Sequence, residues 1–307
     1  MRRYLLSRFL SFLPSLLGAL TLVFFLIHLV PGDPVEAMLG ETASATDKEA
    51  LRRELGLDEP LWKQYISYLQ GLAVGDLGHS LYYHGEVTDL ILLRFPATLE
   101  LTLAAMTAAI LLAFPLGILA AWKSHTWMDR LALLFSLFGL AMPNFWLGPL
   151  LIIVFSIDLG LLPVSGSGSL THLVLPALTL GTAMAALLTR MIRSSLLEVI
   201  HEDYIQAARA KGLSERKVWL KHALRNSLLP VITILGLQFG ALLAGSVITE
   251  TIFAWPGIGR LTIEAIQTRD YLLVQGCVLA IAVSYLVINL FTDVLYRLID
   301  PRISYGK

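Results

Sequence analysis

Long apolar blocks alternate with polar segments along this chain. Six apolar stretches approach the length of a membrane span, at residues 9–30, 99–122, 131–155, 173–192, 228–252 and 272–298. About 20 apolar residues in helical conformation cross a bilayer, and a helix satisfies its own backbone hydrogen bonds there. The pattern therefore predicts an all-α fold, a polytopic membrane bundle of six transmembrane helices.

Composition supports a membrane protein. Hydrophobic residues make up 56% of the chain and charged residues 15%, whereas about a quarter of a soluble domain is charged. The first apolar stretch follows Arg2 and Arg3 as a secretory signal would, but it exceeds the roughly 7 to 15 residues of a signal core. We therefore expect an uncleaved first span.

Basic residues are distributed unevenly among the segments that connect the spans. If both termini are cytoplasmic, sixteen of the 23 Lys and Arg residues face the cytoplasm and seven face outside. Five of those seven fall in the long segment 31–98, where charge has less influence on topology. The asymmetry predicts a multi-pass chain with both termini cytoplasmic.

The pattern predicts three parts. Residues 1–30 form the N-terminal tail and first span, and residues 99–307 form a five-helix core with a cytoplasmic coupling loop at about 193–227. Between them, residues 31–98 are too many for a simple connector and contain helix signals, because Thr46 precedes one helical segment and Pro60 opens another. We expect a small external subdomain of short helices, acting either as a packed cap or as a receptor-docking surface.

A second external segment follows the fifth span. Trp255-Pro256-Gly257 predicts a turn, and residues 260–269 predict a short interfacial helix. Three carboxylates gather near it, and we expect them to be solvated, with receptor contact as the alternative: Glu250, Glu264 and Asp270. The segments 31–98 and 255–269 are predicted to face a receptor.

Two spans carry unusual residues. Pro143 and Pro149 interrupt the third span and should bend it, and small residues in the fifth span permit close helix approach in lipid. The predicted packing residues are Gly236, Gly240, Ala244 and Gly245. The candidates to line a solute path are Asn144, Gln238, Ser246 and Thr249. The alternative for the kink at Asn144 is packing against neighbouring helices, and for the other three it is interhelical hydrogen bonding.

A basic insert separates the fourth and fifth apolar stretches. Residues 190–225 carry eight Lys or Arg and four Asp or Glu, and inserting those basic residues at mid-bilayer would cost on the order of 20 kcal/mol. The insert therefore stays in water. Helix-favouring residues 205–211 end at Gly212, and Ser214 is a plausible N-cap for a second helix, so the insert predicts helix, turn and helix.

The first of these helices has a nearly smooth face. Tyr204, Ala208 and Gly212 lie four residues apart, with Ala207 and Lys211 beside them. Small side chains would let the backbone of another protein come close. An ordinary solvated surface helix is the alternative.

The chain resembles a known family at this point. Gln206-Ala207-Ala208, Gly212 and then Leu229-Pro230 resemble the Glu-Ala-Ala…Gly…Leu-Pro cytoplasmic loop of binding-protein-dependent ABC importer permeases, with Gln206 in place of the Glu. The form AARAKGLSERKVWLKHALRNSLLP is closer to the peptide and nickel subgroup. Further motifs occur in family order: Pro31-Gly32-Asp33-Pro34, Phe95-Pro96-Ala97-Thr98-Leu99-Glu100, Met142-Pro143-Asn144-Phe145, Phe253-Ala254-Trp255-Pro256-Gly257-Ile258-Gly259 and Asp300-Pro301-Arg302.

The resemblance implies a type I ABC importer permease of the dipeptide, oligopeptide and nickel family, in a bacterial or archaeal inner membrane. It implies a homologous second permease, two ATPase subunits that bind ATP and Mg, and an external substrate-binding protein, with no cofactor on this chain. The residues implied in ATPase coupling are Tyr204, Gln206, Ala207, Ala208, Lys211 and Gly212. The implied solute is a peptide or a related small molecule, with nickel (chelate) or glutathione as alternatives.

Signatures of catalysis are missing from the sequence. Trp122 stands where a phosphate-binding loop would need glycine before Lys123-Ser124, and the seven His residues lack metal-ligand spacing. We expect no catalytic residue, no metal site and no enzyme activity in this chain. An ion-coupled carrier is disfavoured because no charged residue lies mid-span; a non-transporting scaffold is the remaining alternative.

Overall fold

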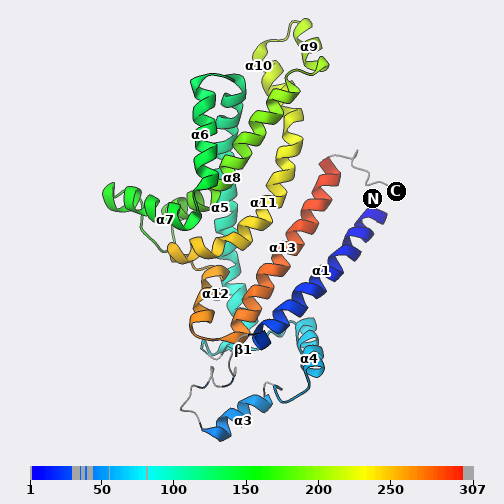
Figure 1. Cartoon of the computed structure of the whole chain (residues 1–307), viewed down its shortest axis with the longest axis vertical. Helices are drawn as coiled ribbons and strands as arrows, with labels where there is room; N and C mark the ends of the chain where they lie inside the picture. Colours follow the sequence, from blue (N-terminus) through cyan, green and yellow to red (C-terminus); the bar gives the residue numbers. More distant parts are fainter. Residues whose placement is uncertain are drawn as a thin grey trace. The chain divides into compact units, whose positions relative to one another are not determined.

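The computed structural model describes residues 2–29, 35, 39, 44–54, 56–80 and 82–299, with the backbone alone at some of them, including 2–9, 229, 245 and 293–299. The architecture is helical (Figure 1). The elements are α1 Arg2–Leu29, α3 Ala45–Glu54, α4 Leu61–Val74, β1 His79–Ser80, β2 Gly85–Glu86, α5 Val87–Trp122, α6 Trp127–Ala141, α7 Asn144–Leu151, η1 Ile152–Asp158, α8 Leu170–Val199, α9 Asp203–Ala210, α10 Glu215–Lys217, η2 Val218–Ala223, α11 Leu224–Ile252, α12 Ile258–Gln267 and α13 Tyr271–Ile299. The antiparallel strands pair His79 with Glu86, and η1 and η2 are π-helical.

The six predicted apolar stretches all fall on helices. Among the described residues, three helices are long and apolar enough to cross a membrane, namely α5, α8 and residues Tyr271–Thr292 of α13. Two bent helix pairs raise this number to five, and Phe12–Phe25 of α1 is a shorter apolar helix. The chain is therefore an all-α membrane protein, as the hydropathy pattern predicts.

The third predicted span is sharply broken. Trp127–Ala141 and Asn144–Asp158 enclose an angle of 111° at Met142-Pro143. The sequence predicts a kink here, but the structure turns α7 almost across α6. Pro143 has no backbone N–H and ends the hydrogen-bond ladder, and α7 begins afresh after it.

Two helix boundaries differ from the prediction. Helix α5 starts at Val87, twelve residues before the predicted start at Leu99, and continues through Pro96. Helix α3 is capped by Ser44 and not by Thr46, since the Asp47 N–H donates to Ser44 Oγ at 3.1 Å. Pro60 precedes α4 as predicted. The motifs 31–34 and 300–302 lie outside the described residues.

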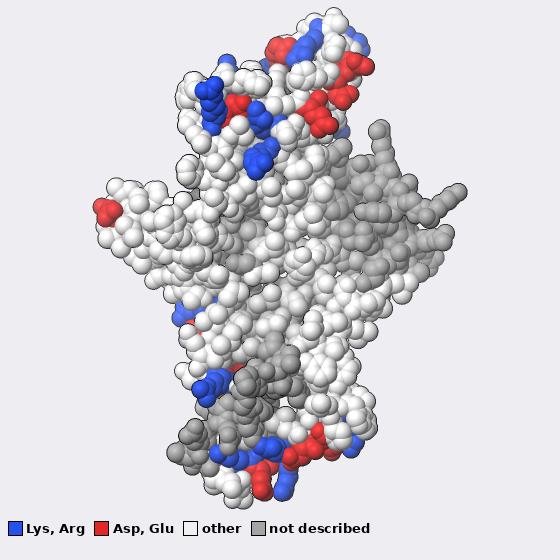
Figure 2. Space-filling view, viewed as in Figure 1, with Lys and Arg blue, Asp and Glu red and all other residues white. Residues whose placement is uncertain are grey.

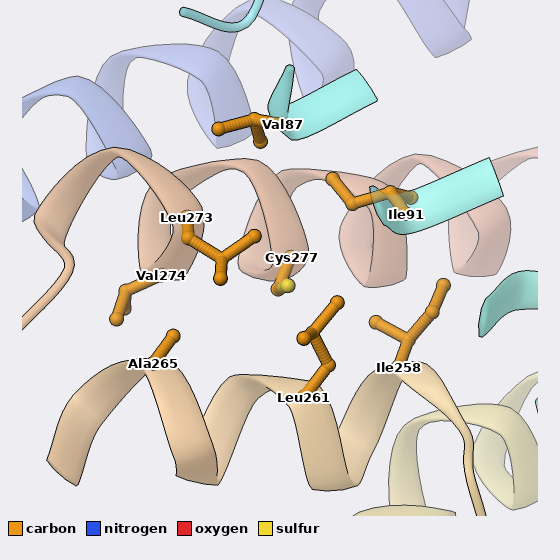
Figure 3. Packing of buried hydrophobic residues seen from close by; sticks show 8 residues of the cluster. All are labelled: Val87, Ile91, Ile258, Leu261, Ala265, Leu273, Val274 and Cys277. Carbon is orange, nitrogen blue, oxygen red and sulfur yellow. The ribbon is translucent and has the colours of Figure 1, made fainter. Parts of the chain in front are cut away.

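The contacts divide the chain into two compact units, and α5 and α13 each contribute residues to both. Unit 1 comprises the described residues within 1–98 and 256–286, and unit 2 those within 99–255 and 287–307. In unit 1, the start of α5, helix α12 and the start of α13 enclose one hydrophobic core (Figure 3). Its buried residues are Val87, Ile91, Ile258, Leu261, Ala265, Leu273, Val274 and Cys277.

Unit 1 also corrects the expectation of solvated carboxylates. Asp270 is buried and accepts hydrogen bonds from Ser80 Oγ and, at 3.2 Å, from the N–H of Leu273. Glu264 accepts from the Tyr83 hydroxyl at 2.9 Å. Burial, together with Glu264, raises the pKa of Tyr83 to about 12, so the phenol remains protonated and able to donate. The two carboxylates therefore fasten the β1–β2 hairpin to α12 and α13.

Helix α8 is the centre of unit 2. It contacts α6, α7 and α11 and buries half of its most apolar window. Glycine permits its closest approaches, because a Cβ at Gly181 would overlap the carbonyl of Ala105 and one at Gly139 would lie 2.8 Å from Ala186 Cβ. Glu250 of α11 is also fully buried, contrary to the solvated position expected for it.

Candidate coupling site and solute path

The basic insert folds as helix, turn and helix, as its sequence predicts. It projects beyond the adjoining ends of α8 and α11 (Figure 1), and residues 200–223 are here called the polar hook. Figure 2 shows charged side chains gathered over this end of unit 2, including the adjoining end of α6, and few over α7. These charged side chains make insertion of the hook into lipid unfavourable.

Gly212 ends the first helix of the hook. Helix α9 stops at Ala210, and Gly212 adopts a φ of 78°, a left-handed conformation that only glycine adopts readily. Its N–H donates to the Arg209 carbonyl at 2.9 Å. A Cβ at this position would meet no atom within 4 Å, so the backbone conformation and not space within the chain requires glycine.

The smooth face predicted for α9 is divided between the chain's own interior and the solvent. Ile205 is fully buried and Ala208 is only 7% exposed, and α9 contacts η2. The exposed side of α9 includes Ala207 and Ala210, three residues apart. Of the two alanines predicted to form the smooth face, Ala207 is exposed, and Ala208 belongs to the packing that holds the helix.

The other predicted coupling residues lie at the exposed edge of the hook. Gln206, Lys211 and Gly212 are exposed, and Tyr204 is exposed while its hydroxyl accepts a hydrogen bond from Asn226 Nδ2 at 2.7 Å. The guanidinium of Arg209 binds the carboxylate of Glu215 through two contacts, of 2.8 and 3.3 Å. Ser195 Oγ donates to the Ser227 carbonyl at 3.0 Å and ties α8 to α11 at the neck of the hook.

A partly buried ion pair braces the base of the hook, and sequence reasoning missed it. Arg193 of α8 binds Asp129 of α6 with both carboxylate oxygens engaged, at 2.5 and 2.8 Å, and Asp129 is 3% exposed. The same carboxylate accepts from the N–H of His125, whose φ is 65°. Nearby, the indoles of Trp122 and Trp219 stack with centroids 6.3 Å apart. The sequence signal that could have predicted this pair is that Asp129 precedes the apolar stretch 131–155 and Arg193 follows the next stretch, 173–192.

The four candidate path residues lie on two helices that contact each other. Asn144 opens α7, and the other three lie on α11. Gln238 and Asn144 are partly buried, and buried Ser246 donates to the Leu243 carbonyl of its own helix. Thr249 is fully buried, and its hydroxyl has no hydrogen-bond partner among the described residues. Their role as a solute path remains a prediction.

The small residues of α11 occupy different environments. At Gly236 a Cβ would overlap Thr292 of α13, and Thr292 Oγ1 donates to the Gly236 carbonyl at 3.3 Å. Gly240 is buried and Ala244 is exposed. The predicted packing at Gly245 lies outside the described side chains. The close approach to α13 therefore depends on Gly236 and Thr292.

A helical membrane bundle with a polar hook between two long spans defines the transmembrane subunit of an ABC importer. Consistent with that class, the profile of the family described as binding-protein-dependent transport system inner membrane component matches residues 113–305. The profile of the N-terminal part of such membrane components matches residues 1–102. The chain belongs to this family and is a permease subunit of its dipeptide and oligopeptide branch.

Curated relatives are similar along their whole length. The chain is 44% identical over 305 residues to the glutathione transport system permease protein GsiC of Escherichia coli (strain K12), covering 99% of this chain and 100% of that protein. The same identity and coverage hold for the GsiC protein of Pectobacterium atrosepticum. The resemblance in the sequence motifs therefore extends to the full chain.

Solved structures with the same fold are more distant. An inward-facing MetNI methionine ABC transporter matches with a TM-score of 0.54 and 17% identity, over 69% of this chain and 96% of that one. An amino acid ABC transporter with histidines matches with a TM-score of 0.54 and 19% identity, over 70% and 95%. These structures establish the fold of the transmembrane subunit.

Proposed function

We propose that this permease imports a small peptide-like solute of the glutathione class. The observation that carries the proposal is the 44% identity to glutathione permeases across 99% of the chain. A dipeptide or oligopeptide is the wider substrate class, and a nickel chelate is the alternative within the family. The chain itself would bind no cofactor, and ATP with Mg would be bound and hydrolysed by separate ATPase subunits.

The proposed assembly contains a second homologous permease, two ATPases and an external binding protein. Both termini and the polar hook would lie in the cytoplasm, supported by the sixteen basic residues assigned to that side. Exposed Ala207 and Ala210 support α9 as the ATPase-docking helix, because methyl side chains let a partner surface approach the helix backbone. Closure of the ATPases would then move the hook.

Movement of the hook would pass to the spans through its base. The Asp129–Arg193 pair joins α6 to α8, and the bond from Ser195 joins α8 to α11. A shift of α9 would therefore be transmitted to three helices together. In this mechanism the spans alternate between outward and inward openings as the ATPases close and separate.

Uptake by the assembled transporter in vesicles tests the substrate and the energy source. The permease pair, its ATPases and its cognate binding protein should accumulate glutathione only with internal ATP, and an ion gradient alone should give none. Nickel accumulation or peptide uptake without glutathione uptake would correct the solute. Uptake driven by an ion gradient would overturn the ABC mechanism.

Ala207→Arg tests docking at the hook. The bulky side chain should overpack a close interface and cost roughly 1 to 3 kcal/mol, which is about a 5- to 150-fold loss of ATPase association. Ala207→Ser is the matched control, since it keeps the side chain small. Co-purification of the ATPases and uptake measure the effect. Unchanged assembly and uptake in Ala207→Arg would show that this side of α9 is a solvated surface. Ala208→Asp is unsuitable here because Ala208 is buried within the chain.

A further inference from the structure

Helix α4 in unit 1 has one face committed to α1. The ring of Tyr65 packs edge-on against Phe24 with centroids 5.1 Å apart, and the ring of Tyr68 lies 5.6 Å from the same phenylalanine. The Tyr65 and Thr21 hydroxyls share a hydrogen bond of 2.7 Å. This contact between two helices 44 residues apart in sequence fixes which side of α4 faces outward.

The exposed side of α4 carries apolar side chains next to the exposed polar side chains of Ser67 and Gln70. Trp62 is 62% exposed and Ile66, one turn later, is 45% exposed, with Leu61 and Val74 also exposed at the two ends of the helix. Lys63 is the only charged residue among its fourteen, and it binds Glu59 at 2.9 Å beyond the start of the helix. A helix that lies in a membrane interface combines such an apolar strip with polar side chains on its other exposed side.

The contact with α1 shows where α4 lies along the apolar segment of that helix. Thr21 and Phe24 lie within the apolar segment Phe12–Phe25, near its C-terminal end. Leu17 and Leu22 of that segment are exposed, as expected for side chains that face lipid. Helix α4 is therefore seated beside the last turns of an apolar segment, and both helices carry exposed apolar side chains.

We propose that α4 is an interfacial helix whose Trp62–Ile66 face binds the phospholipid bilayer at the boundary between headgroups and acyl chains. Tryptophan favours that boundary because its ring is apolar and its N–H is polar, and the Lys63–Glu59 ion pair beside it is exposed and polar, as contact with headgroups requires. In the topology proposed above this is the outer leaflet. The helix would anchor the segment before α5 to the membrane surface, a role that is independent of the transported solute.

Spin-label accessibility tests this proposal in the assembled permease pair in phosphatidylcholine and phosphatidylglycerol vesicles. A nitroxide is attached to a cysteine introduced as Trp62→Cys, Ile66→Cys or Val74→Cys. The unsubstituted protein, whose one cysteine, Cys277, is buried, is treated with the same reagent to measure background labelling. Collision rates are compared with oxygen, which concentrates in lipid, and with a water-soluble nickel chelate. Labels at the three positions should collide several-fold more with oxygen than with the chelate.

Matched labels calibrate the measurement. Leu17→Cys on the exposed side of α1 should give the lipid pattern, and Glu49→Cys on exposed α3 should give the water pattern. A water pattern at Trp62 and Ile66 would overturn the proposal. Low collision rates with both reagents would also overturn the proposal, because they would show that a protein covers this face. If the collision rates fell only when the binding protein was added, that protein would be the receptor. Co-purification with the second permease confirms that each labelled chain is folded.

Discussion

Helices α9 and α12 are of similar length, eight and ten residues, and each accompanies the end of a long span, but they are held in opposite ways. Helix α12 buries five residues, Ile258, Gly259, Leu261, Thr262 and Ala265, and three of them, Ile258, Leu261 and Ala265, belong to the core of unit 1. Helix α9 buries only Ile205 and Ala208. Helix α12 is therefore part of the scaffold of unit 1, whereas most of α9 stays exposed, as the proposed docking of a partner on α9 requires.

Hydrogen bonds show the same difference. The N–H of Ile258, at the start of α12, donates to the buried Thr98 hydroxyl at 2.8 Å, and Tyr83 reaches Glu264 on the same helix. The polar contacts of α9 are exposed, and exposed ion pairs such as Arg209–Glu215 contribute about 0 to 1 kcal/mol. The Asp129–Arg193 pair at the base of the hook is less exposed, with side chains 4% and 21% exposed, so we expect it to contribute more than the pair on α9.

The largest effect should come from breaking that base. Arg193→Met leaves the Asp129 carboxylate buried without its partner and should destabilise the protein by about 3 to 5 kcal/mol. Asp129→Leu combined with Arg193→Met should recover most of the loss, because no unpaired charge remains. Thermal unfolding of the purified permease measures both variants. If Arg193→Met unfolded at the same temperature as the wild type, the Asp129–Arg193 pair would contribute no more to stability than the exposed ion pair on α9.

The next effect concerns the scaffold helix. Leu261 is 1% exposed, and Leu261→Ala should cost about 2 to 5 kcal/mol through lost burial and the cavity left behind. Ile266→Ala on the exposed side of α12 is the matched control and should change stability by less than about 0.5 kcal/mol. Thermal unfolding in detergent measures both variants. Equal midpoint temperatures would contradict the conclusion that α12, unlike α9, is held by its buried face.

The smallest effect is local to the hook. Gly212→Ala forces a residue with a Cβ into a left-handed conformation and should cost about 1 to 2 kcal/mol, while Gly212→Asn should cost less. Hydrogen exchange of the α9 amides should accelerate roughly tenfold in Gly212→Ala without a change in the global transition. Unchanged exchange in α9 would show that Gly212 does not determine where the helix ends.

Sequence reasoning succeeded where the determinants are local. Hydropathy located the apolar helices, because crossing lipid requires a continuous run of apolar residues. The stop at Gly212 and the break at Pro143 depend on the backbone chemistry of single residues, and both appear in the structure. The order of family motifs indicated the class of protein before any coordinates, since those motifs extend over most of the chain.

The tertiary structure decided what local patterns cannot express. Ala207 and Ala208 are identical in the sequence, and only the packing of α9 against η2 buries one and exposes the other. Asp270 and Glu250 appeared to be surface charges because their partners and burial depend on segments distant in sequence. The Asp129–Arg193 pair joins residues 64 apart, so its pairing exists only once α6 packs against α8. Burial and pairing are properties of neighbours in space, and the chain acquires them only on folding.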